Sequence, residues 1–187
     1  MNAKQIIKFG LLLMLVCSLA AAALAYTYAK TKPVIEQRKI EAEKEAIQSI
    51  FPQAAEVKIV ITEKDNFKVV FDQGQKELGV AMKAAPAGYG GPIEILVGVT
   101  REGKVSAIMI INQNETPGLG TKITAPKFYE QFAGKQDKEL ALKKDSGAID
   151  AITAATISSR AVAKGVQEAV NKVLKFYEGQ KSNEPQK

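Results

Sequence analysis

Histidine is absent from this sequence, and the chain contains a single cysteine, Cys17. One cysteine cannot form an intrachain disulfide, and a chain without histidine cannot build the usual zinc sites or a histidine-ligated haem. Ser-His-Asp and Cys-His catalysis are excluded for the same reason. A redox role would therefore require a non-metal cofactor.

Clustered basic charge is also missing. The net charge is +6, but the lysines are scattered among glutamates and do not alternate with aromatic residues. A nucleic-acid-binding protein typically has a basic stripe or an aromatic stacking platform, so we expect no nucleic-acid partner. The 187 residues are 46% hydrophobic and 25% charged, which fits one folded domain with an appendage.

An uncharged apolar run extends over 21 residues, from Phe9 to Ala29. About 20 apolar residues are enough to cross the hydrocarbon core of a bilayer as a helix. We therefore interpret residues 1–30 as a retained single-pass transmembrane anchor. Positive charges occur on both sides of the run, so the charge bias does not set its orientation.

Two other targeting signals are weaker alternatives to a retained anchor. Ala23-Leu24-Ala25 resembles a signal-peptidase site, but the apolar run is long for a signal peptide. A lipoprotein signal is disfavoured because Val16, before Cys17, is larger than the small residue that such sites require.

Residues 31–52 are charged and helix-prone, and we interpret them as a stalk helix that Pro52 ends. The sequence leaves open whether this helix is solvated or packs against another subunit. Its apolar residues form a loose stripe: Ile35, Ala42, Ile47 and Ile50.

Five segments alternate in the manner of strands and are joined by short turns, such as Lys64-Asp65-Asn66 and Arg101-Glu102-Gly103. This order predicts an antiparallel meander within an α+β fold. The predicted strands are 56–62, 67–72, 76–85, 92–100 and 104–112.

Two helices complete the predicted domain, residues 53–179. The first covers residues 123–134, with Thr124 as N-cap and Pro126 in its first turn. The second begins near Thr153 or Ala154 and ends at Gly179, before a polar tail over 180–187. An apolar stripe predicts that it packs on the sheet: Ile157, Ala161, Val162, Val166, Ala169, Val170, Val173, Leu174 and Tyr177.

Three stretches have the composition of a binding site. Residues 85–96 and 112–123 are rich in glycine and proline, which suits close approach to a ligand, although plain turns would have the same composition. The third stretch, residues 150–160, precedes the long helix. The N-terminus of that helix would suit a phosphate, with the hydroxyl of Thr156 one turn in. Capping by Asp150 or Thr153 is the simpler explanation of those two residues but does not explain Thr156.

The segments GYGGPIEILVGV, ETPGLGTKI and DAITAATISSRAV, together with the anchor, resemble the FMN-binding domain family. That family includes RnfG of the Rnf electron-transport complex, which is the more similar, and the subunit designated C of the sodium-pumping NADH:quinone reductase. Residues 150–156 match its flavinylation signature, D-x-x-(S/T)-G-A-T, except that Ala154 replaces the glycine. Asn114 stands where many relatives have histidine.

The resemblance implies that a flavin transferase attaches FMN to Thr156 through a phosphoester, which would make the chain a phosphoprotein in that sense. It implies polar contacts from Glu115 and Thr116 and apolar cover from Pro117 and Leu119, while Tyr89 would either stack on the flavin or close the pocket. We expect no catalytic residue and no metal ligand. The full set of expected cofactor-binding residues is Asp150, Thr153, Ala154, Ala155, Gly88, Tyr89, Gly90, Gly91, Glu115, Thr116, Pro117, Gly118, Leu119, Gly120 and Lys122.

The function implied by the resemblance is electron transfer within an Rnf-type ion-translocating ferredoxin:NAD oxidoreductase complex. The chain would be a redox-carrier subunit and not a complete enzyme, with polytopic subunits as partners and ion pumping left to them. It would be a single-pass protein of the cytoplasmic membrane with an extracytoplasmic FMN domain. Three alternatives remain: the related subunit of the sodium-pumping quinone reductase, a freestanding extracytoplasmic flavoprotein, and a flavin-free anchored scaffold.

Overall fold

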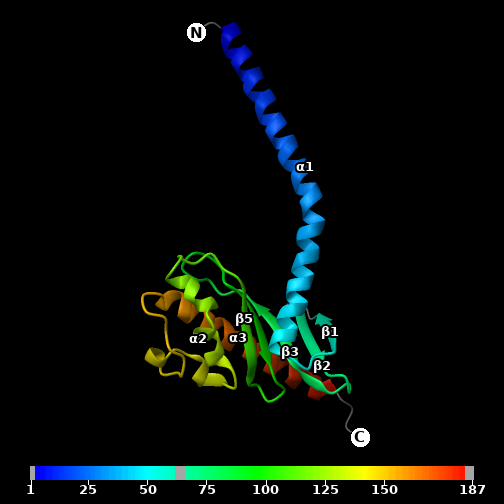
Figure 1. Ribbon diagram of the computed structural model, residues 1–187, viewed down its shortest axis with the longest axis vertical. Coiled ribbons are helices and arrows are strands. Elements are labelled where there is room, and N and C mark those ends of the chain that lie inside the picture. The colour runs from blue at the N-terminus through cyan, green and yellow to red at the C-terminus, as the bar shows by residue number, and fades with distance from the viewer. Residues whose placement is uncertain (1–2, 62–65, 184–187) are drawn as a thin grey trace. The chain divides into compact units, whose positions relative to one another are not determined.

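The computed structural model describes residues 3–61 and 66–183, which form two compact units, residues 1–44 and 45–187 (Figure 1). Lys64 and Asp65, in the predicted turn between the first two strands, lie outside the described residues. The same holds for residues 184–187 of the predicted polar tail.

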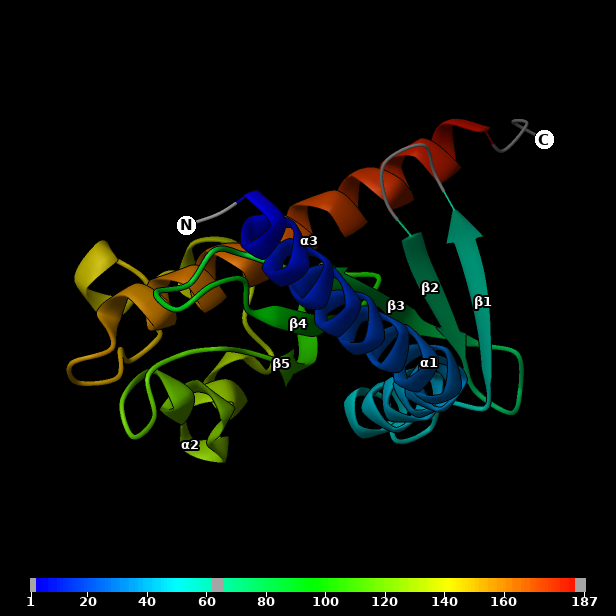
Figure 2. The same ribbon diagram turned by 90° about the horizontal axis from the view of Figure 1, so that it is seen from above.

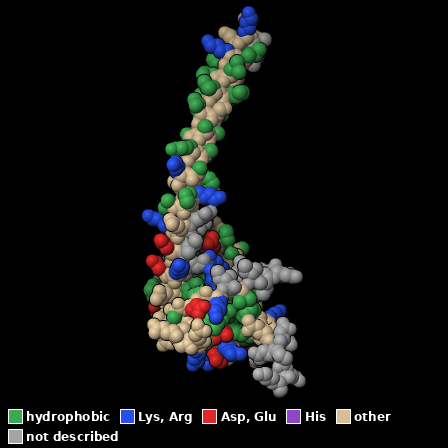
Figure 3. All heavy atoms as spheres, turned by 90° about the vertical axis from the view of Figure 1, so that its right-hand side faces the viewer, with side chains coloured by type: hydrophobic (Ala, Val, Ile, Leu, Met, Phe, Trp, Pro, Cys, Tyr) green, Lys and Arg blue, Asp and Glu red, His purple; other side chains and the backbone are tan. Residues whose placement is uncertain are grey.

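One continuous helix, α1 (Ala3–Ile50), covers both the predicted anchor and most of the predicted stalk helix. Its segment Ile7–Ile35 is long and apolar enough to cross a membrane. Apolar side chains are spaced along this part of the helix, as Figure 3 shows. The helix ends two residues before Pro52, in agreement with the predicted stop.

The five predicted strands form one antiparallel sheet in the order β1-β2-β3-β4-β5, so the meander is confirmed (Figures 1 and 2). Each strand pairs with its neighbour in the sequence, because each connection is a short turn or loop. The strands are β1 (Glu56–Ile61), β2 (Asn66–Phe71), β3 (Glu77–Ala84), β4 (Glu94–Val99) and β5 (Val105–Asn112).

The long C-terminal helix, α3 (Thr156–Asn183), packs its apolar stripe on one face of the sheet. Three of our predictions for this helix were wrong: its start, its end and the burial of Ile157. It begins at Thr156, since the chain before it makes a tight turn, and it continues through Gly179 to Asn183. The side chain of Ile157 is 54% exposed because it lies in the first turn of α3, outside the core. The other predicted stripe residues are buried or, in the case of Leu174, packed against the core.

The opposite face of the sheet is covered by the last turns of α1 and by Phe51. A Cβ on Gly98 would lie 2.1 Å from Cγ2 of Ile50, so the absence of a side chain there lets the helix end approach the sheet. Ser106 donates a hydrogen bond to the carbonyl of Ile50 at 3.0 Å. The end of the stalk therefore packs on its own domain, which neither sequence alternative anticipated, while Ile35 is 47% exposed. This second core cluster contains Ala46, Ile47, Ile50, Phe51, Val70, Ala81 and Leu96.

The predicted helix over 123–134 was wrong as a single element. The residue before Pro126 is sterically held in an extended conformation, and Ala125 has φ −79° and ψ 139°. Ala125 is therefore the N-cap, and the hydroxyl of Thr124 donates instead to the carbonyl of Thr121. Short helices follow one another here: η1 (Gly120–Thr124), α2 (Pro126–Tyr129), η2 (Glu130–Phe132), η3 (Asp137–Leu140) and η4 (Lys143–Asp145).

Candidate functional site

The three stretches that the sequence singled out meet around one cavity of about 550 Å³, which we call the Thr156 cavity. It lies where the loops before β4 and after β5 reach the N-terminus of α3. Segments separated by more than sixty positions in the sequence thus form a single site. The cavity is lined by Tyr89, Glu115, Thr116, Leu119, Gly120, Ala154, Ala155, Thr156, Ile157 and Ser158.

Glu115 is the buried centre of this arrangement, with a side chain that is 5% exposed. Its Oε1 accepts a hydrogen bond from the backbone N–H of Gly90 at 3.0 Å. Its Oε2 accepts a hydrogen bond from the hydroxyl of Ser158 in α3. Glu115 therefore links all three stretches, and the contact with the flavin edge that we expected of it stays a prediction.

Glycine is required where the loops close around Glu115. A Cβ on Gly120 would lie 2.7 Å from Oε2 of Glu115 and 3.0 Å from Oγ of Ser158. A Cβ on Gly90 would lie 1.9 Å from the carbonyl oxygen of Asn114. Neither glycine has space for a side chain, so the glycine-rich composition of these loops reflects close packing as well as turns.

Three apolar side chains form an exposed rim at this cavity. Tyr89 is 70% exposed, Ile157 is 54% exposed and Leu119 is 41% exposed. Tyr89 and Leu119 were expected at the site. Ile157 was missed because helical periodicity assigned it to the buried stripe, although its place directly after Thr156 was a signal for the site.

A tight turn precedes α3. The N–H of Ala155 donates to the carbonyl of Ile152 at 3.0 Å, and Ala154 has φ +62°. A positive φ at the third position of a four-residue turn is typical of type II turns, which favour glycine there. This turn explains why the family signature has glycine at this position. Ala154 adopts the same positive φ, which is sterically unfavourable for a residue with a Cβ.

Thr156 is the first residue of α3, and not one turn in as we predicted. The residue before it, Ala155, takes the N-cap position, so capping by Asp150 or Thr153 is excluded by position. The carboxylate of Asp150 instead pairs with the ammonium of Lys143 at 2.8 Å. Thr156 is half-buried and lines the cavity, which places its hydroxyl at the electropositive end of the helix.

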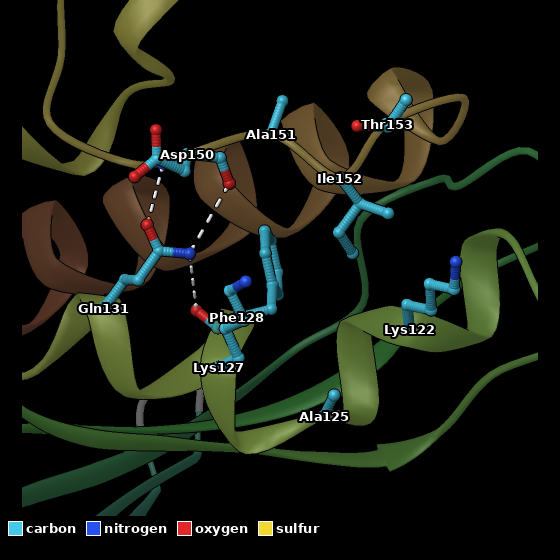
Figure 4. Close-up of a pocket in the computed structure, with 9 residues that line it drawn as sticks. All are labelled: Lys122, Ala125, Lys127, Phe128, Gln131, Asp150, Ala151, Ile152 and Thr153. Atoms are coloured by element: carbon cyan, nitrogen blue, oxygen red, sulfur yellow. Dashed lines mark hydrogen bonds between the residues drawn. The ribbon is translucent and has the colours of Figure 1, made fainter.

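Asp150, Thr153 and Lys122 line a different cavity of about 630 Å³, which we call the Lys122 cavity (Figure 4). The expected cofactor site is therefore divided by the segment that precedes Thr156. Gly88, Gly91, Pro117 and Gly118 line neither cavity. The Lys122 cavity is lined by Lys122, Ala125, Lys127, Phe128, Gln131, Asp150, Ala151, Ile152 and Thr153.

The fold is that of the FMN-binding domain, and residues 88–171 match the FMN-binding domain family. Residues 1–50 match the RnfG N-terminal region. The chain belongs to the RnfG family of ion-translocating oxidoreductase complexes.

This family assignment is supported by relatives that cover most of the chain. It is 36% identical over 170 residues to the subunit designated G of the proton-translocating ferredoxin:NAD(+) oxidoreductase complex of Clostridium ljungdahlii, covering 89% of this chain and 91% of that protein. It is 33% identical over 190 residues to the corresponding subunit of the Na(+)-translocating ferredoxin:NAD(+) oxidoreductase complex of Acetobacterium woodii, with the same two coverages.

Solved structures share the fold at low sequence identity. NqrC of Shewanella oneidensis matches with a TM-score of 0.52 and 18% identity, covering 69% of this chain and 73% of that one. The subunit designated C of the Na(+)-translocating NADH-quinone reductase of Parabacteroides distasonis matches with a TM-score of 0.53 and 22% identity, covering 66% and 78%.

Proposed function

We propose that this chain is an electron-transfer subunit of an Rnf-type membrane complex and carries FMN through a phosphoester to Thr156. The observation that carries the proposal is the position of Thr156. Its hydroxyl belongs to the first residue of α3 and lines a cavity on which both glycine-rich loops converge.

The residues present fit FMN. The Thr156 cavity, at about 550 Å³, lies within the usual range for cofactor sites. The N-terminus of α3 would stabilise the negative charge of a phosphate. The rim of Tyr89, Leu119 and Ile157 offers apolar surface for a planar ring. When bound, FMN supplies the electron-transfer chemistry, and the protein supplies binding and orientation.

The chain's own task would be to hold the cofactor and to limit its contact with water. Glu115 fixes the loops, and the apolar rim would cover part of a bound ring. A threonine hydroxyl is a weak nucleophile without an activating base. No histidine is available for that step, so a flavin transferase is proposed to supply the base and the metal. Asp150, whose side chain is 65% exposed, would be accessible to that enzyme.

Membership of a complex follows from the relatives, which are named as subunits of ion-translocating oxidoreductases. We propose a single-pass anchor within residues 1–30, a connecting stretch of α1 after it, and an FMN domain on the extracytoplasmic side of the cytoplasmic membrane. The end of α1, from Glu45, belongs to the compact unit of that domain. Ion movement would belong to polytopic partner subunits, because one helix cannot form a channel. The similarity to NqrC and its counterpart concerns the fold alone, so a role in an Rnf-type complex is favoured over one in a quinone reductase.

Intact mass under denaturing conditions tests the attachment. The full chain is produced with and without a flavin transferase, beside Thr156→Val and a control, Thr124→Val, which removes a threonine hydroxyl outside the signature and outside both cavities. Wild type and the control should gain one FMN mass, and Thr156→Val should gain none. A wild type that gains nothing, or a Thr156→Val variant that is still modified, would overturn the proposal.

A further inference from the structure

The segment 150–155, which presents Thr156, is held at its start by Gln131 from η2. The N–H of Asp150 donates to Oε1 of Gln131 at 2.8 Å. The amide nitrogen of Gln131 donates to the carbonyl of Phe128 at 3.3 Å and makes a longer contact of 3.5 Å with the carbonyl of Asp150 (Figure 4). The side-chain amide of Gln131 therefore contacts both the N–H and the carbonyl of Asp150, in the manner of backbone pairing between neighbouring β-strands.

Ser159 of α3 holds the other end of the segment. Its side chain is fully buried, and its hydroxyl accepts a hydrogen bond from the N–H of Ile152 at 3.0 Å. The same hydroxyl donates to the carbonyl of Ala155 at 2.8 Å. One side chain thus closes both ends of the turn that contains Ala154.

The turn needs such support because its own sequence opposes it. Ala154 has φ +62°, a backbone conformation in which a residue with a Cβ is strained. The side chains of the signature do not compensate, because the carboxylate of Asp150 pairs with Lys143 and Thr153 is exposed. A strained backbone persists only where its surroundings over-determine it. Here the surroundings are Gln131 and Ser159.

We propose that Gln131 and Ser159 are positioning residues for flavin attachment. They hold segment 150–155 in the shape that places the hydroxyl of Thr156 at the cavity, so the signature residues alone are not sufficient. This inference rests on the proposed function, because it assumes that Thr156 is the attachment point. It assigns a role to two residues that do not touch the Thr156 cavity and are not themselves modified.

The test measures the rate of FMN attachment to the full chain in detergent, by intact mass over time with a flavin transferase. The variants are Gln131→Ala and Ser159→Ala. Gln167→Ala and Ser106→Ala are matched controls, since each removes one side-chain bond to a backbone carbonyl elsewhere in the domain. The two test variants should slow attachment by about ten-fold or more, because small displacements of a reacting group have large effects on rate.

A second readout separates positioning from loss of stability. Amide hydrogen exchange at Asp150 should rise in Gln131→Ala, and exchange at Ile152 should rise in Ser159→Ala, with melting temperatures comparable to the controls. Gln131→Glu keeps an acceptor for the N–H of Asp150 and should restore part of the rate. If Ser159→Ala does not fold, the two variants at the half-buried Gln131 decide.

The outcomes are distinguishable. If wild type is modified and the folded test variants keep its rate, this inference is overturned while the proposed function stands. If slow attachment is matched by the controls, a general loss of stability explains it and the inference is again overturned. If wild type gains no FMN, the proposed function fails and this inference fails with it.

Discussion

The Thr156 cavity and the Lys122 cavity share the segment around Thr153 as a boundary but are built differently. The first is organised by Glu115, a buried carboxylate that receives hydrogen bonds from two other segments. The second is framed by two exposed lysines and by Asp150, whose ion pair with Lys143 lies at the surface. The difference teaches that the first cavity is closed around a buried, hydrogen-bonded carboxylate, whereas the second is bordered by exposed charged side chains.

Removing the buried carboxylate should have the largest effect on this comparison. Glu115→Ala leaves the N–H of Gly90 and the hydroxyl of Ser158 without their acceptor and opens a void beside Gly120. We expect a loss of about 2 to 3 kcal/mol in the free energy of unfolding, together with poor FMN attachment. Urea denaturation followed by circular dichroism measures it, with the exposed Glu94→Ala as control. A loss no larger than that of the control would contradict the central role of Glu115.

Relieving the backbone strain at Ala154, in the turn between the two cavities, should have an intermediate effect. It should raise the free energy of unfolding, whereas loss of Glu115 lowers it. Ala154→Gly permits φ +62° without steric conflict and should raise the free energy of unfolding by about 1 kcal/mol. The matched control is Ala151→Gly, where φ is not positive, and it should lower stability by about 0.5 to 1 kcal/mol. Urea denaturation of both variants checks this. Equal effects of the same sign would show that the turn is not strained.

The ion pair beside the Lys122 cavity should matter little for stability. Both Asp150→Asn and Lys143→Met break a surface contact, so each should change the free energy of unfolding by less than about 1 kcal/mol. Flavin attachment should separate them. It should slow in Asp150→Asn, where the carboxylate available to the transferase is lost, and persist in Lys143→Met. Equal slowing in both variants would assign the effect to the ion pair itself.

The smallest effect should come from the exposed pair that joins η4 to α3. A bidentate hydrogen bond from Arg160, at 2.8 and 2.9 Å, and its positive charge hold the pKa of Asp145 below its ordinary value of 3.8. A lowered pKa gives stability that is complete above the unfolded-state pKa and is lost as the pH falls through the folded-state pKa.

Asp145→Asn should therefore lower stability slightly at neutral pH, where the contribution of the ionised pair is complete, and its profile should converge with that of wild type as the pH falls. Thermal unfolding from about pH 5 down to about pH 2 measures it. The control is Asp72→Asn, at an acid that binds only its own turn. A difference in stability between the variant and wild type that stays the same from about pH 5 to about pH 2 would show that the ionised pair does not contribute.

Local patterns predicted the sheet well, because alternation and turn residues are properties of short segments. The packing of the end of α1 on the sheet face opposite α3 was not predictable in this way. It depends on small residues such as Gly98 in β4 matching Ile50 in α1, which are far apart in the sequence. The start of α3 was misplaced because Ala154 and Ala155 favour helix locally, while the turn is imposed by contacts with Ser159.

The site was predicted in part for a similar reason. The resemblance selected the stretches that line the Thr156 cavity, since the signatures are continuous in sequence. It did not separate the two cavities, and it gave no role to Ser158 or Gln131. The bonds of these two residues join segments distant in the chain, and no spacing rule within a single segment reveals them.

The packing of the last turns of α1 on the sheet decides how a water-soluble form of the domain should be cut. A fragment that starts at Gln53 would leave Val70, Ala81 and Leu96 uncovered and should aggregate. A fragment that starts at Glu45 keeps Ile47, Ile50 and Phe51 in place, omits the apolar segment and should remain monodisperse. The junction between the long helix and the sheet is thus part of the folded domain, and it should be retained in any truncated form used for spectroscopy or crystallisation.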